Sequence, residues 1–112
     1  MNERDKILLL HMRDAALEVI EFTNDETSDS LVHNRLLLRG LSMSVGIIGE
    51  AASKVSAEFR DQHPEIPWVQ IVSMRNRIIH GYYDIRLNRL WDTATISVPE
   101  LLAQLEKLIP PD

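Results

Sequence analysis

The chain has 112 residues, of which 45% are apolar and only 5% aromatic, and its formal charge is −5. This length suits a single domain, 1–112, built around one hydrophobic core. The absence of cysteine excludes disulfides and thiolate metal sites. The apolar run Ile7 to Leu10 is too short for a signal sequence or a membrane span. We therefore expect a cytoplasmic protein with no membrane contact.

The first half of the chain predicts two amphipathic helices separated by a polar loop. Residues 5–22 have apolar side chains at helical spacing, and residues 23–29 (TNDETSD) are typical of a loop. A longer helix is expected over residues 30–60. Its apolar seam consists of Leu41, Val45, Ile48, Ala52, Val55 and Phe59.

The second expected helix also carries a stripe of small residues: Ser42, Gly46, Gly49, Ser53 and Ser56. Glycine inside a helix costs about 1 kcal/mol relative to alanine. The two glycines therefore indicate that another backbone comes close at this stripe. That backbone belongs either to another helix of the same chain or to a second subunit.

The second half predicts further helices and no strand. Pro67 suits the first residue of a third helix, which we expect to end near His80 with Gly81 as its cap. From Leu87 onward the apolar residues keep helical spacing, interrupted by Pro99. A capping box at residues 97–100 would make this region two helices; otherwise it is one kinked helix. The fold class is thus all-α, an up-and-down bundle of four to five helices.

The segment 74–84 (MRNRIIHGYYD) concentrates the polar residues that interest us most. Arg75 falls within an apolar face of the third helix, so it needs a carboxylate or a phosphate as partner. If its role is structural, Glu50 and Asp84 are the available carboxylates. Asn76 and His80 are four residues apart and are expected to share a helix face.

These side chains suggest metal-free cleavage of RNA. A histidine can accept or donate a proton near neutral pH, so His80 can transfer a proton during attack of the ribose 2′-OH on the adjacent phosphate. Arg75 would stabilise the charge that builds on the phosphoryl oxygens. The remaining histidines (His11, His33 and His63) lack metal-ligand spacing with a carboxylate, so we expect neither a metal nor another cofactor.

The charge distribution agrees with an RNA partner despite the acidic total. Between residues 68 and 90 there are four arginines and one aspartate, a local charge of about +3. Phosphate contacts depend on local rather than total charge. Beside Arg75, we predict Arg77, Arg86 and Arg89 as RNA-binding residues.

The pattern Arg75-Asn76-x-x-x-His80-x-Tyr82 resembles the R-x4-H-x-Y motif of the HepT-like family within the HEPN superfamily. The segments 47–52 (IIGEAA), 63–68 (HPEIPW) and 90–99 resemble the same family in the same order. The resemblance covers most of the chain from about residue 36 onward.

This resemblance implies a HEPN-like homodimer whose two motifs face a shared cleft. HepT proteins are metal-independent endoribonucleases that act as toxins of two-gene systems on RNA, with tRNA and mRNA as candidate substrates. Carried over, Arg75 and His80 are the catalytic pair, and Asn76 and Glu50 are supporting residues. The partner antitoxin is a minimal nucleotidyltransferase that adds AMP groups to the motif tyrosine, here Tyr82, with Tyr83 as the weaker candidate.

Two other functions remain open from the sequence. The chain could be a non-catalytic subunit that helps a nucleotidyltransferase hold its substrate. It could also be a helical interaction module whose polar cluster is structural.

Overall fold

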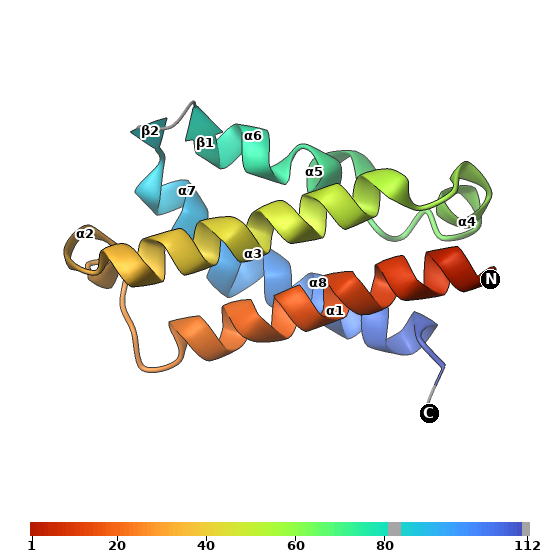
Figure 1. Ribbon diagram of the computed structural model, residues 1–112, viewed down its shortest axis with the longest axis horizontal. Helices are drawn as coiled ribbons and strands as arrows, with labels where there is room; N and C mark the ends of the chain where they lie inside the picture. The colour runs from red at the N-terminus through yellow and green to blue at the C-terminus, as the bar shows by residue number, and fades with distance from the viewer. Residues whose placement is uncertain (81–83, 111–112) are drawn as a thin grey trace.

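The computed structural model describes residues 1–80 and 84–110, without the side chains of His80 and Asp84. Within them the chain folds into helices and one short strand pair (Figure 1). The helices are α1 (Glu3–Thr23), α2 (Ser30–His33), α3 (Arg35–Lys54), α4 (Ala57–Gln62), α5 (Trp68–Val72), α6 (Met74–Ile78), α7 (Leu87–Asp92) and α8 (Val98–Leu108), with a π-helical segment, η1 (Thr93–Ser97), between the last two. The all-α class is therefore confirmed.

The arrangement centres on the two longest helices, α1 and α3, which run side by side in opposite directions (Figure 1). Helix α8 packs on α1, and α5 and α6 pack on α3. The strands β1 (Ile79–His80) and β2 (Asp84–Ile85) pair antiparallel, with Ile79 opposite Ile85 and His80 opposite Asp84. The expectation of no strand is thus wrong at this one place.

The expectation of four to five helices is wrong because local caps divide the long ones. Asn34 has an extended backbone, and its side chain accepts a hydrogen bond from Leu37 N at 3.0 Å, so α3 starts afresh after α2. Ser56 caps α4 in the same way, accepting from Phe59 N at 3.2 Å. The seam predicted for this region is nevertheless correct, because all six of its residues are buried.

The third expected helix is also divided. Ser73, with φ −88° and ψ 0°, separates α5 from α6. Helix α6 ends at Ile78 rather than at His80, and its expected cap, Gly81, lies outside the described residues. His80 is therefore part of a strand and not of a last helical turn.

The region from α7 to α8 forms one continuous helical run through η1. Ser97 has helical dihedral angles and its side chain accepts no capping hydrogen bond, so the expected capping box at 97–100 is wrong. Pro99, which cannot donate a backbone hydrogen bond, is the second residue of α8 and lies two residues after the end of the π-helical segment.

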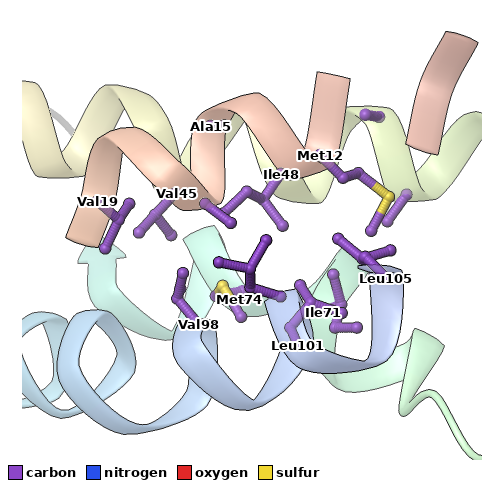
Figure 2. Close-up of a cluster of buried hydrophobic side chains, with 14 of the residues drawn as sticks. Met12, Ala15, Val19, Val45, Ile48, Ile71, Met74, Val98, Leu101 and Leu105 are labelled. Atoms are coloured by element: carbon purple, nitrogen blue, oxygen red, sulfur yellow. The ribbon is translucent and has the colours of Figure 1, made fainter. Parts of the chain in front are cut away.

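The core lies where α1, α3, α5, α6 and α8 face one another (Figure 2). Met12, Val45, Ile48 and Leu105 are fully buried within it. By length and hydropathy α3 would pass for a membrane-spanning helix. Its inward face, with Leu41, Val45 and Ile48, supplies the centre of this core, which accounts for the buried part of its apolar residues.

A buried carboxylate joins the start of α1 to the start of α4. Asp5 is only 2% exposed, and it accepts hydrogen bonds from Ser56 N at 2.9 Å and Ser56 Oγ at 2.6 Å. These two hydrogen bonds offset the cost of removing the carboxylate from water.

Candidate active site

Gly46 and Gly49, two glycines of the small-residue stripe, determine how the motif segment (residues 68–85) lies on α3. A Cβ atom added at Gly49 would be 3.2 Å from the carbonyl oxygen of Ile71 and 3.4 Å from that of Val72. The close backbone expected from the sequence is thus α5 of the same chain. Gly49 lets α5 approach, and α6 continues from it along α3.

Arg75 is brought to the surface by this docking. A Cβ at Gly46 would be 3.6 Å from Arg75 Cδ, so the aliphatic part of the arginine lies across the glycine. The residue is exposed, and it has no hydrogen bond or ion pair with any side chain that the structure describes. Glu50 instead contacts Lys54, with Nζ and Oε1 at 3.2 Å. A buried Arg75–Glu50 pair, one of the structural alternatives, is therefore wrong, and the side chain of Asp84 lies outside the described part.

Arg75 and Glu50 line the same groove, which has a volume of about 580 Å³. Ile79 of β1 and Ile85 of β2 also line it, and they are opposite each other in the strand pair. The backbone of His80 therefore directly follows a groove residue. The structure brings Arg75, Glu50 and the backbone of His80 into one region.

Asn76 is placed differently from the expectation. It is exposed on α6 and does not line this groove. Because α6 ends before the strand that holds His80, the shared helix face of Asn76 and His80 is wrong. Tyr82 and Tyr83 lie outside the described residues.

The predicted RNA-binding arginines do not form one patch with Arg75. Arg77 follows Arg75 by two residues, about 200° around a helix, and faces a second groove of about 1020 Å³. Arg89 of α7 lines that groove too, and its Nη1 lies 3.5 Å from Arg77 O. Arg86 is exposed ahead of α7 and lines neither groove.

The sequence profile described as "Ribonuclease HepT-like" matches residues 12–108. The chain belongs to the ribonuclease HepT-like family. The family expected from the motif is thereby confirmed, and the match also includes most of α1, where the resemblance was less specific.

Individual relatives of this HepT-like chain are similar along most of their length. A Methanocaldococcus jannaschii protein named "Putative RNase" is 33% identical over 107 residues, which cover 95% of this chain and 98% of the relative. A Thermococcus cleftensis protein named "Probable ribonuclease HepT" is 33% identical over 94 residues, covering 83% and 86%. A "Putative RNase" of Caldanaerobacter subterraneus is 32% identical, covering 81% of both chains. No solved structure gives a significant match.

Three basic or titratable residues of the Arg75 groove were missed from the sequence: His11, Arg39 and Lys54. They come from α1 and α3, far from the motif in the chain. A signal for two of them exists, because Arg39, Met43, Ile47, Glu50 and Lys54 recur at spacings of four and three on the outer face of α3. The groove thus presents several cations and one carboxylate, an arrangement that suits a phosphate ligand.

The described residues contain no cluster of metal-ligand side chains. Among them no group of three His, Asp or Glu side chains could hold an ion.

Proposed function

We propose that this HepT-like chain is a metal-independent endoribonuclease that acts as the toxin of a two-gene toxin–antitoxin system in the cytoplasm. The observation that carries the proposal is Arg75: it is exposed in a cationic groove beside the backbone of His80, in a chain of the ribonuclease HepT-like family. The relatives named as RNases support the substrate class.

In the proposed reaction, the groove binds the phosphate that links two ribonucleotides. His80 accepts the proton of the 2′-OH as this oxygen attacks the phosphorus, and the bond to the 5′ oxygen breaks after that oxygen receives a proton. The products are a 2′,3′-cyclic phosphate and a 5′-OH. Arg75 stabilises the charge on the phosphoryl oxygens, a contribution of about 10²–10³-fold at comparable sites. Glu50, which lines the same groove, orients these groups.

A homodimer would complete this site. Leu36, Met43 and Ile47 recur on the outer face of α3 with exposed fractions of 84%, 68% and 39%, and the last two line the Arg75 groove. Apolar side chains exposed together favour burial by a partner. A second copy docking there would bring its own motif to the groove, so that one His80 accepts the proton and the partner's His80 donates it.

The dimer is tested by placing a charge on this apolar face of α3. We expect a dimer for the unmodified chain and a monomer of about half that mass for Met43→Arg, by sedimentation at micromolar concentration. Val69→Arg is the matched control, because Val69 is 77% exposed and lines neither groove. A monomeric unmodified chain, or a Met43→Arg variant that stays dimeric, contradicts this interface.

Catalysis is tested by incubating the chain with cellular RNA in the presence of a chelator and analysing the new ends. We expect 2′,3′-cyclic phosphates from the unmodified chain and uncut RNA with His80→Ala. Growth arrest on expression, lost in His80→Ala, is the matching observation in cells. A chain that binds RNA or nucleotides but cuts nothing is instead the substrate-binding subunit of a nucleotidyltransferase. Cleavage that stops with chelator contradicts the metal-free reaction.

Silencing by the partner nucleotidyltransferase is proposed at Tyr82. The tyrosine oxygen attacks the α-phosphorus of ATP, pyrophosphate leaves, and the phenol proton is lost. The added AMP carries negative charge next to His80 in the chain, where it would compete with RNA phosphate for the cations. Mass spectrometry should find AMP on the peptide of Tyr82, with loss of cleavage, and neither effect in Tyr82→Phe. Modification that persists in Tyr82→Phe and disappears in Tyr83→Phe would move the acceptor to Tyr83.

A further inference from the structure

The second groove lies between α5 and α6 on one side and α7, η1 and α8 on the other. Its floor is apolar, formed by the buried residues Ile71, Met74, Ile78 and Leu101. At the end away from α7, Gln104 Nε2 donates a hydrogen bond to Glu65 O at 3.0 Å. Helix packing therefore forms this groove, and it is separate from the groove that Arg75 lines.

Two arginines stand together at the α6–α7 end of this groove. Arg89 Nη1 lies 3.5 Å from the backbone carbonyl oxygen of Arg77, so the Arg89 side chain reaches the end of α6 that carries Arg77. Both are exposed, and neither forms an ion pair with a carboxylate in the described ranges 1–80 and 84–110. Two arginines that line the same end of a groove, without a carboxylate partner among the described residues, suit a phosphate, to which each guanidinium can donate paired N–H bonds.

We propose that Arg77 and Arg89 bind a backbone phosphate of single-stranded RNA outside the bond that is cleaved. This inference rests on the proposed ribonuclease function. Arg75 and Arg77 project from opposite sides of α6, whose diameter with side chains is about 10–12 Å. A flexible single strand that crosses the exposed side of α6 reaches both arginines, whereas a stiff duplex does not bend around one helix.

Charge limits where this phosphate sits. Asp92 and Glu100 line the same groove and repel a phosphate that moves further along it. The anion is thereby confined to the two arginines, so the site recognises the strand's backbone and its length. RNA long enough to reach both grooves binds better than a dinucleotide that occupies the Arg75 groove alone.

The first test measures binding in a His80→Ala background, which prevents cleavage, by fluorescence anisotropy of a labelled single-stranded RNA. Because two charge-assisted contacts are removed, Arg77→Ala with Arg89→Ala should weaken binding about tenfold or more. The slope of log affinity against log salt should also fall in magnitude by about 0.7 for the phosphate lost. Arg4→Ala with Lys107→Ala is the control, because it also removes two positive charges, from exposed positions that line neither groove.

The second test measures cleavage kinetics on a long single-stranded RNA and on a dinucleotide. In the double arginine variant KM for the long RNA should rise while kcat stays the same, so its advantage over the dinucleotide shrinks. A double arginine variant that matches the control Arg4→Ala with Lys107→Ala in both salt slope and KM overturns the inference while leaving the ribonuclease proposal standing. A chain that cuts nothing but still binds RNA through these arginines refutes the ribonuclease proposal and keeps the second site.

Discussion

The pair α1–α3 and the motif segment 68–85 are built in opposite ways. Both long helices are capped at their starts, by Asn2 and Asn34, and contribute fully buried side chains to the core. The described part of the motif segment consists of two five-residue helices without side-chain caps and a pair of two-residue strands. Helices this short are not stable alone, so the segment that carries the proposed catalytic residues depends on the scaffold for its position. Stability and chemistry should therefore respond to different substitutions.

The largest effect that separates the two regions is expected from Arg75→Ala. RNA cleavage should fall by about 10²–10³-fold, because a preorganised cation is lost. Since the side chain is exposed and unpaired among the described residues, the free energy of unfolding should change by no more than about 0.5 kcal/mol. Cleavage assays and urea titration of the same variant measure both. A large loss of stability would make Arg75 a structural residue.

The scaffold should show the reverse response in Ile48→Ala. Ile48 is fully buried between α1 and α5, so its truncation should lower the free energy of unfolding by about 2–5 kcal/mol. Ile96→Ala is the matched control, because Ile96 is 56% exposed and should cost little. Urea titration compares the two, and equal effects would mean that the core is placed wrongly.

A somewhat smaller effect is expected where α1 is joined to α4. Asp5→Ala leaves Ser56 N and Ser56 Oγ without their acceptor, which should cost about 1.5–3 kcal/mol of stability. Asp14→Ala serves as comparison, because its pair with Arg13 is exposed and should contribute about 1 kcal/mol at most. Thermal unfolding of both variants is sufficient, and a neutral Asp5→Ala would contradict this link.

The smallest effects should arise at the contact between the two regions. Gly49→Val places a branched side chain against the carbonyl oxygens of Ile71 and Val72, and should lower stability by about 1–3 kcal/mol. Cleavage should fall as well, since α5 and α6 must move. Gly46→Ala meets Arg75 Cδ only at an ordinary contact distance of 3.6 Å, so it should raise stability by up to about 1 kcal/mol. Effects of the same sign in both variants would show that the glycines are not distinguished by the approach of α5.

Sequence reasoning predicted the fold class and the buried seam because both follow from local spacing. Leu41, Val45 and Ile48 recur at helical period, and only one face of α3 can be buried against α1 and α5. The helix breaks at Asn34 and Ser56 were missed although both residues are good caps. Their side chains act as caps only because the chain turns there. The apolar residues keep helical spacing across both breaks, so the sequence pattern did not indicate the turns.

The sequence named candidate site residues but not how the fold arranges them. Arg75 and Glu50 do share a groove, and the backbone of His80 adjoins it, whereas Asn76 and the arginines at 77, 86 and 89 do not line it. The error came from extending α6 as a regular helix through His80. Whether Ile79 and His80 continue a helix or pair with Asp84 and Ile85 depends on residues across a turn, which helical spacing does not report.

The sequence by itself determined the family, the apolar faces and the motif residues, because each depends on residue type at fixed separations. Only the tertiary structure decided that Gly49 admits α5 of the same chain, and that Arg75 and Arg77 face two different grooves. A glycine in a helix indicates that a neighbouring segment approaches closely. Which segment it is depends on how all the helices pack. The two arginines are separated by the same helix that carries them, and the neighbours of that helix define the groove on each side.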